Sequence, residues 1–380
     1  MLKNLYGRKH TKITQSSLNV LLTTHERYMT GRGGARTHLK FADLDELNLA
    51  NRILNEIDFS GATLVGANLH GSNLTRASFY CADLRCCDLR NTKMQYTDLR
   101  GASFKGARLS YAVLDNADLR TAMMMFVEQD GVSVSGWAGQ QDGGHIAVRG
   151  GMHGVDFSNC SLKGVSFGNA KLDNVDFSDA LLQGASFKGA KLSNVTLRGA
   201  ILTGVDLKHL DVPPEIIAEC VTDATPQSIA RSARLKDVLA THQTWVATDG
   251  KQGAAAVLDG EDLRPLHKHF TGRALTGLSA RNTMAVGIDF SGCQLQGAKF
   301  DGADLRDADF SGADLCGASF AGAKLAHARF NKAHLGNLHL LNGGIVAPSL
   351  LGTQAVAEQF QVAILDDSLA ALGLDAAAEI

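Results

Sequence analysis

The chain has 380 residues, more than one ordinary compact domain needs, and its 37 basic and 39 acidic side chains almost balance. This balance excludes the strong net field expected of a nucleic-acid-binding protein or of a polyanion mimic. The 40 Gly and only 5 Pro fit a regular backbone with few helix-stopping loops, and argue against a disordered chain.

The sequence predicts a cytoplasmic protein. Lys3, Arg8 and Lys9 lie near the N-terminus, but no continuous apolar core follows them, so we expect no signal peptide. No stretch approaches the about 18 apolar residues of a membrane span, so we expect no membrane partner.

Residues 1–38 are predicted to form a helical cap. The cap is basic, because these residues contain seven Lys or Arg and only one acidic residue, Glu26. Within them LNVLLTTHERYM is the helical segment, and His25 and Tyr28 are expected to lie over the first turn of the structure that follows. A glycine-rich turn follows the helix, and Arg32 and Arg36 beside it are candidate contacts with a partner.

Residues 39–124 have an apolar side chain at every fifth position, from Leu39 to Met124. A small residue usually stands two positions earlier, as Ala62 does before Leu64. A period of five fits neither an α-helix at 3.6 nor a strand at 2, so each repeat must contain a turn or corner. The segment is therefore predicted to be a solenoid.

The same period returns in residues 152–212 and again in residues 258–342, where the apolar run extends to Leu340. In both runs Phe and Leu alternate, and the predicted core ladder consists of Phe157, Phe167, Phe177, Phe187, Phe290, Phe300, Phe310, Phe320 and Phe330. If residues 20 apart stack, as four sides per coil require, Phe lies on Phe and Leu on Leu. Three sides would stack Phe on Leu, and interiors tolerate such volume mismatch poorly.

Over roughly 160 residues these repeats resemble the pentapeptide repeat family. The resemblance implies an all-β solenoid, a right-handed quadrilateral β-helix with four repeats per coil. Here it would form two units with short α-helical caps and a helical linker.

An Asp recurs one position before many of the apolar centres, at Asp58, Asp83, Asp98, Asp118, Asp156, Asp176, Asp289, Asp304 and Asp314. Such a row could form an acidic face or hold cations. We favour a structural role, because short Asx side chains bond nearby backbone amides and stabilise tight turns.

Residues 125–151 interrupt the repeats and shift their phase by three residues. We expect a glycine-rich loop that leaves the solenoid. Phe126 and Trp137 are candidate partner contacts there, because aromatic side chains are over-represented at binding hot spots; the alternative is that they fold back onto the solenoid wall.

Residues 213–257 are predicted to be a helical linker and second cap. Thr225 and Pro226 give an N-cap followed by Pro at the first helical position. The segment LKDVLATHQTWV matches the first cap, placing His242 and Trp245 where His25 and Tyr28 stand.

Residues 343–380 are predicted to be an acidic, partly helical tail. An apolar stripe there contains Val356, Phe360, Ile364, Leu365, Leu369 and Leu372. The stripe either caps the last coil or pairs with a second copy of the chain as a homodimer, so Phe360, Ile364 and Leu369 are candidate partner contacts.

No nucleotide-binding, hydrolase or paired-cysteine motif occurs, and the pair His267 and His269 is too weak a cue for a metal site. We therefore expect no enzymatic activity, cofactor or metal. The resemblance implies a protein-binding scaffold with a partner that it does not identify. The alternative it implies is a DNA mimic that modulates or protects the type II topoisomerase DNA gyrase, and the balanced charge argues against this. Neither hypothesis predicts direct nucleic-acid binding.

Overall fold

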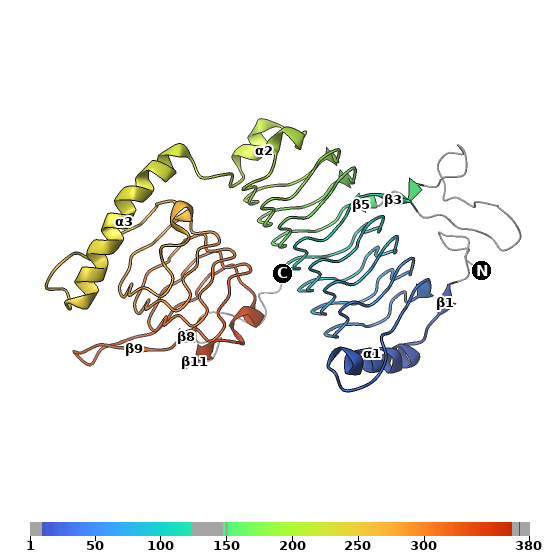
Figure 1. The fold of residues 1–380 in the computed structure, drawn as a ribbon, viewed down its shortest axis with the longest axis horizontal. Helices are drawn as coiled ribbons and strands as arrows, with labels where there is room; N and C mark the ends of the chain where they lie inside the picture. The colour runs from blue at the N-terminus through green and yellow to red at the C-terminus, as the bar shows by residue number, and fades with distance from the viewer. Residues whose placement is uncertain (1–9, 124–146, 149–150, 367–371, 373–380) are drawn as a thin grey trace, which may run out of the picture. The chain divides into compact units, whose positions relative to one another are not determined.

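A computed structural model describes residues 10–123, 147–148, 151–366 and 372. The chain divides into two compact units, Met1–Asp223 and Ala224–Ile380. In each unit the chain winds into successive coils that stack on one another, as Figure 1 shows. The architecture is a repeat β-helix.

The coils are held together by parallel pairing between residues twenty positions apart. Asp289 pairs with Asp309, and Asp309 pairs with Arg329. The backbone N–H of Phe310 donates to the carbonyl of Arg329 at 2.8 Å, which shows how one coil bonds to the next. Twenty residues are four five-residue repeats, so each residue pairs with the equivalent residue four repeats later.

The core is a set of side-chain columns that run through the coils. All nine phenylalanines of the predicted ladder are buried, at 0 or 1% exposed. Phe310 stacks on Phe290 at 5.1 Å and on Phe330 at 5.2 Å between ring centroids. Leu295, Leu315 and Leu335 are buried as well. Like side chains thus stack on like.

A tight turn follows each inward-pointing residue. The residue two positions after the centre has a left-handed backbone, as at Gly61 with φ 65° and Gly292 with φ 63°. Glycine adopts this conformation at little cost, and Asn and Asp tolerate it better than most residues. This requirement explains the recurrent glycines of the sequence.

The first unit opens with a helix packed against its coils. Its elements are β1 (Thr11–Lys12), α1 (Gln15–Met29), β2 (Ala42–Asp43), β3 (Ala122–Met123), β4 (Ala147–Val148), β5 (Gly151–His153), β6 (Lys171–Asp173), β7 (Lys191–Ser193), η1 (Leu207–His209) and α2 (Pro214–Ala218). β1 pairs with β2 in parallel, β3 with β4 antiparallel, and β5, β6 and β7 form a parallel sheet. Most other coil contacts are isolated bridges.

The coils continue in register past the interruption between the first two apolar runs. Asp98 pairs with Asp118, 20 residues on, whereas Arg108 pairs with Asp156, 48 residues on. The difference of 28 residues is inserted into a continuous ladder, which accounts for the phase shift of three. Phe126 and Trp137 lie outside the described residues.

The second unit contains α3 (Pro226–Ala247), η2 (Arg264–Leu266), β8 (His334–Leu335), β9 (Leu338–His339), β10 (Ile345–Val346), η3 (Ala357–Phe360) and β11 (Ile364–Leu365). The Thr225 side chain accepts from the Ser228 N–H at 3.1 Å, so α3 begins where its cap and proline predict. Leu235, Leu239 and His242 are the buried residues of α3, whereas Ile229 near its start is 55% exposed.

The last coil departs from the predicted boundary. The run of core residues was expected to reach Leu340, but Leu340 is 41% exposed, because the chain leaves the coil after Gly336 as a hairpin. The coil resumes at Ser349, which pairs with Ser319 thirty residues earlier. The tail was predicted to be partly helical, and its described residues include strand β10, the 3-10 helix η3 and strand β11, which pairs with β8 in parallel. The residues of the apolar stripe therefore do not share one continuous helix.

Candidate interaction surface

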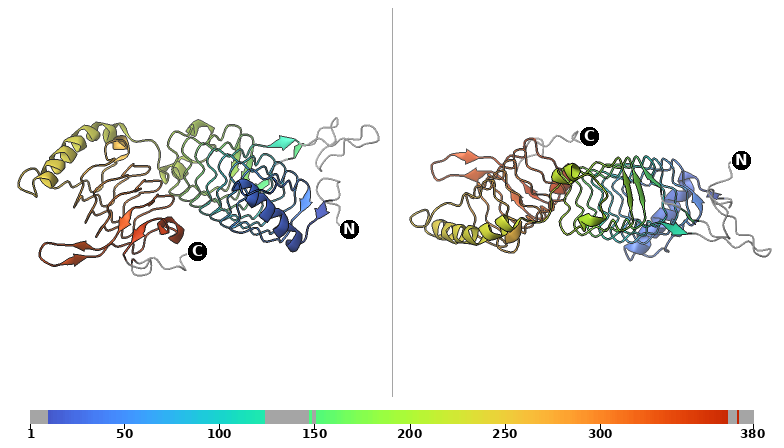
Figure 2. Two further views of the ribbon diagram at one scale, coloured as in Figure 1. Left: turned by 60° about the horizontal axis from the view of Figure 1, so that its bottom comes forward. Right: turned by 90° about the horizontal axis from the view of Figure 1, so that it is seen from above.

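The antiparallel hairpin β9–β10 is the clearest candidate for a binding surface. Ile345 pairs with His339 and Val346 with Leu338. At its tip the Asn342 side chain accepts from the Gly344 N–H at 3.0 Å, and Gly343 has a left-handed backbone with φ 83°. Figures 1 and 2 show the hairpin extending beyond the coils of its unit.

Four apolar side chains of this hairpin and one of the coil that follows it are exposed to solvent. Leu341 is fully exposed, Ile345 is 62% exposed, and Leu351 on the following coil is 67% exposed. We call Leu340, Leu341, Ile345, Val346 and Leu351 the hairpin surface. Several exposed apolar side chains in one region are typical of a protein interaction site.

The base of the hairpin is fixed on the coil at Gly317. A Cβ at this position would lie 2.7 Å from the Leu338 Cβ and 3.0 Å from the Val346 carbonyl oxygen. Only glycine allows this approach, so the coil and the hairpin are in direct contact there.

Sequence reasoning missed the hairpin because the boundary at residue 342 divided it. The available signal was the sequence Asn342-Gly343-Gly344 between two apolar segments. Asn-Gly and Gly-Gly dipeptides favour tight hairpin turns.

The tail residues differ in accessibility. Phe360 was a candidate partner contact, but it is fully buried, with its ring 4.6 Å from that of Phe330. It therefore covers the aromatic column and cannot contact a partner in this conformation. Ile364 is 55% exposed and stays accessible, whereas Leu369 lies outside the residues that the structure describes.

The two candidate arginines of the first unit lie near its cap. Arg32 is exposed. The Arg36 guanidinium donates to the Glu56 carbonyl, with Nε at 3.0 Å, and its side chain is 42% exposed. Arg36 also faces the Glu56 carboxylate, with Nη1 3.9 Å from Oε2, so it is tied to the coil.

The two cap histidines occupy equivalent positions in their units. The Nδ1 of His25 accepts from the Thr37 N–H at 3.2 Å, and its Nε2 lies 3.0 Å from the Asn55 carbonyl. The Nδ1 of His242 accepts from the Ala256 N–H at 3.0 Å. Both rings are buried, and burial lowers both pKa values below the ordinary range. Each histidine therefore ties its helix to the segment that enters the first coil.

The aromatic residues beside these histidines differ. Tyr28 on α1 is 49% exposed, whereas Trp245 on α3 is half-buried and stacks on His242 with centroids 5.6 Å apart. Tyr28 therefore covers its unit less completely than Trp245 does.

The row of aspartates has the structural role expected for it. All nine accept a hydrogen bond from the backbone N–H two residues later, at 2.8 to 3.4 Å. Each carboxylate thus stabilises the turn that follows it.

Four of these nine carboxylates, and those of Asp88 and Asp262, are also neutralised by arginine. Ion pairs at 2.5 to 2.9 Å join Asp83 to Arg85, Asp88 to Arg90, Asp98 to Arg100, Asp118 to Arg120, Asp262 to Arg264 and Asp304 to Arg306. Burial raises the pKa of Asp118, but hydrogen bonds from Arg120 outweigh it and hold that pKa below its usual range. The coil surface is therefore charge-balanced and not acidic.

Within the described part of the chain, no helix is both long and apolar enough to cross a membrane.

The family description "Pentapeptide repeats (8 copies)" matches residues 42–79, 82–120, 152–189, 180–212, 275–312 and 300–337. These ranges together cover more than half of the sequence. The chain belongs to the pentapeptide repeat family. Proteins of this family are generally non-enzymatic repeat proteins.

Several solved pentapeptide repeat proteins are similar to this member. HetL from the cyanobacterium Nostoc sp. strain PCC 7120, involved in heterocyst differentiation regulation, is 20% identical over 81% of this chain and 85% of its own, with a TM-score of 0.32. AT2G44920 from the Arabidopsis thaliana thylakoid lumen is 31% identical over 20% of this chain and 53% of its own, with a TM-score of 0.20.

Full-length QnrB1, a plasmid-mediated fluoroquinolone resistance protein, is 14% identical over 80% of this chain and 92% of its own, with a TM-score of 0.17. These TM-scores are too low to indicate a shared function. No protein with a curated description matches the chain.

Proposed function

We propose that this pentapeptide repeat protein is a non-enzymatic scaffold that binds a protein partner through the hairpin surface. The observation that carries the proposal is the solvent-exposed apolar hairpin inserted into the last coil, with Leu341 fully exposed and Ile345 62% exposed. Burial of such a side chain would contribute about 1.5–3 kcal/mol of stability, which each one loses by its exposure to water. An insertion that only closed a coil would not require apolar residues at exposed positions.

The finer form of the solenoid is part of the same proposal. Pairing at twenty residues, together with columns of like side chains, supports four sides per coil. The family resemblance supports a right-handed winding. Such a frame presents flat faces and holds an inserted hairpin on a stiff base.

The partner is best described as a protein with an apolar groove or patch. No Asp, Glu, Lys or Arg stands between Lys332 and Glu358, the stretch that contains the hairpin, and an interface core is depleted in charged residues. The insertion that contains Phe126 and Trp137 remains a second proposed contact region.

A second copy of the chain is the other proposed partner, through the tail residue Ile364 and its neighbours. Light scattering distinguishes the two. A mass that stays at 40.3 kDa at all concentrations would remove the homodimer.

The scaffold proposal is tested by affinity capture from the native lysate. We expect the double variant Leu341→Asp/Ile345→Asp to lose the partner that the unmodified protein captures. Val257→Asp is the matched control, because Val257 is 65% exposed in the same unit but is not part of the hairpin surface. Equal recovery with the double variant and with the control would overturn the proposal.

The DNA-mimic hypothesis is less well supported. Such a mimic presents unpaired carboxylates in place of phosphates, whereas here Asp83, Asp98 and Asp118 are each paired with an arginine two residues later. In the described coils these pairs leave fewer unpaired carboxylates than the hypothesis requires.

A further inference from the structure

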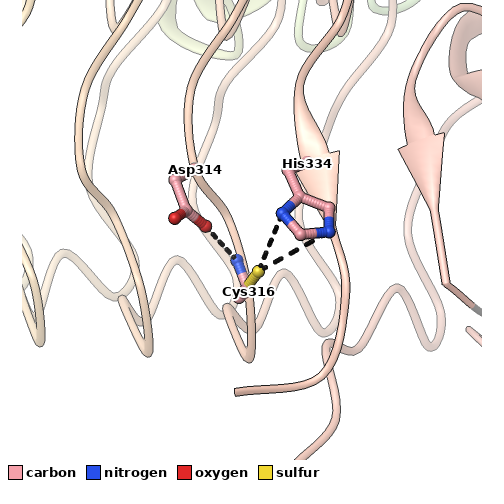
Figure 3. Close-up of side chains that lie close together, drawn as sticks. All are labelled: Asp314, Cys316 and His334. Carbon is pink, nitrogen blue, oxygen red and sulfur yellow. Dashed lines mark hydrogen bonds between the residues drawn. The ribbon is translucent and has the colours of Figure 1, made fainter. Parts of the chain in front are cut away.

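Three different metal-binding side chains meet on the second unit. The carboxylate of Asp314, the thiol of Cys316 and the imidazole of His334 offer donor atoms that all lie within 4.8 Å of one another. Figure 3 shows Asp314 and Cys316 on one coil and His334 on the neighbouring coil, with the sulfur near the imidazole ring.

The coil geometry brings these residues together. Asp314 and His334 are twenty residues apart and pair across adjacent coils, and Cys316 follows Asp314 by two positions. On the next strand, Ile364 of β11 pairs with His334, and Asp366 follows it by two positions. Four donor residues therefore lie on three neighbouring strands.

A glycine keeps the space between them open. Gly336 follows His334 by two positions, as Cys316 follows Asp314 and Asp366 follows Ile364. Gly336 therefore lies between Cys316 and Asp366. A Cβ there would lie 1.9 Å from the Asp366 Oδ2 and 2.8 Å from the His334 Nε2. Any other residue would fill the site.

Hydrogen bonds orient the donors. The His334 Nε2 lies 3.2 Å from the Asp366 Oδ1, so Nε2–H donates to that carboxylate and leaves Nδ1 unprotonated. The Cys316 Sγ lies beside the ring, 4.0 Å from Nε2, so the ring has to turn for Nδ1 to share an ion with the sulfur. Nδ1 lies 3.3 Å from the Cys316 Sγ. On the other side, the Gln296 amide donates to the Asp314 Oδ2 at 2.7 Å. Metal-binding histidines typically have a carboxylate partner of this kind.

We propose that Asp314, Cys316 and His334 bind one divalent transition-metal ion, with zinc preferred, and that Asp366 positions His334. On binding, the Cys316 S–H bond breaks, the proton passes to solvent and a sulfur–metal bond forms without electron transfer. Water would complete a four-coordinate site. This proposal does not depend on the proposed scaffold function.

The spacing suits such an ion. Zinc binds sulfur at about 2.3 Å and nitrogen or oxygen at about 2.0–2.2 Å, so tetrahedral donors lie about 3.3–3.6 Å apart. The Sγ–Nδ1 separation of 3.3 Å falls in this range. All three donors lie within 4.8 Å of one another, so small side-chain rotations would bring them to these separations. The mixture of thiolate, imidazole and carboxylate suits zinc better than magnesium or calcium.

An ion can reach the site from solvent. Cys316 itself is 8% exposed, whereas the side chains of His334 and Asp366 are 40% and 45% exposed.

Cys316, His334 and Asp366 also have the order of a thiol nucleophile, its base and the group that orients the base. The carboxylate of Asp314 beside the sulfur favours the metal, because a second acceptor there stabilises a cation and has no role in activating a thiol. Alkylation separates the two chemistries. We expect bound zinc to protect Cys316 from iodoacetamide, and equal alkylation with and without zinc would contradict the proposal.

The decisive test titrates the full chain, freed of metal, with cobalt(II) and then zinc. We expect one cobalt ion per chain with a thiolate-to-cobalt charge-transfer absorption, which zinc abolishes by displacement. Cys316→Ser should lose this absorption, and Asp366→Asn should weaken binding about 10- to 100-fold. Cys86→Ser is the control and should retain full binding, because Cys86 is an exposed cysteine of the other unit.

Gly336→Ala provides a variant that alters no donor, and we expect it to reduce cobalt affinity while circular dichroism shows the fold intact. No charge-transfer absorption in the unmodified protein, or the same absorption in Cys316→Ser, would overturn the proposal.

Discussion

At the scale of single residues, the interior depends on aromatic rings that stack on their equivalents one coil away. The Phe310 ring lies between Phe290 and Phe330, and its edge contacts Phe300 and Phe320 with centroids 5.7 and 5.5 Å away. Such pairs add about 0.5–1.5 kcal/mol beyond their burial. One substitution in the column therefore disturbs at least four neighbours.

We expect Phe310→Asp to abolish folding of the second unit. The change loses about 3–5 kcal/mol of core packing, and an unpaired buried charge costs several more. Asp309→Asn is the matched control and should be mild, because an amide oxygen can still accept from the Ser311 N–H, now at 2.8 Å. Thermal melts in which both variants behave alike would contradict the inward orientation of Phe310.

Protonation of His25 should weaken the first unit in mild acid. Burial lowers its pKa, so below the ordinary value of about 6.5 the unfolded chain binds protons that the folded chain does not. The stability is complete above this pH and falls as the pH drops toward the lower folded pKa.

Denaturant unfolding at about pH 7.5 and about pH 5.5 measures this effect. In His25→Asn the Asn oxygen can replace Nδ1 as acceptor, and the variant should show a smaller loss between the two conditions than the unmodified protein. His242→Asn should act in the same way on the second unit, because burial also lowers the pKa of His242. An unchanged pH dependence in both variants would show that these rings do not titrate as described.

The residues that sequence reasoning placed correctly are those that obey the period of five. Phe310 and Asp289 have roles that recur along the repeats, so a local pattern suffices to predict them. Cys316 and His334 are eighteen positions apart and meet only because coils stack every twenty residues. Their proximity could have been found by aligning the sequence in rows of twenty. The burial of Phe360 depends on where the hairpin ends, which the period does not encode.

At the scale of elements, the hairpin β9–β10 depends on one close contact with the coil. Gly317 lies beneath Leu338, and the strand pairing then extends the hairpin away from the coil. The hairpin is an insertion of ten residues, since Ser319 pairs with Ser349 thirty residues later, where the regular separation is twenty. The repeat itself therefore does not need the hairpin.

We expect Gly317→Ala to displace the hairpin and to weaken partner capture. Gly312→Ala is the matched control, because Gly312 and Gly317 have the same left-handed backbone, with φ 66° and 67°, but a Cβ at Gly312 meets nothing within 4 Å. Both variants should lose about 1–2 kcal/mol from backbone strain. Only Gly317→Ala should speed hydrogen exchange at the Leu340 amide, which donates to the Gly344 carbonyl. Equal exchange in the two variants would show that Gly317 does not anchor the hairpin.

At the scale of the whole molecule, the total charge is almost balanced, as it is within the coils. The chain has 37 basic and 39 acidic residues, and arginines two positions after an aspartate neutralise much of the acidic row. We therefore expect no effect on DNA gyrase supercoiling, with or without a quinolone, even at a large molar excess. Inhibition or drug protection at stoichiometric protein would revive the DNA-mimic hypothesis.

The most direct test of the scaffold proposal is photo-cross-linking from a reactive amino acid placed at position 341 of the full chain in its native cells. We predict a discrete cross-linked protein from this position and none from position 257, which is exposed in the same unit but distant from the hairpin in sequence. Cross-links of equal yield from both positions, or none from position 341, would contradict the proposal that the hairpin binds a protein partner.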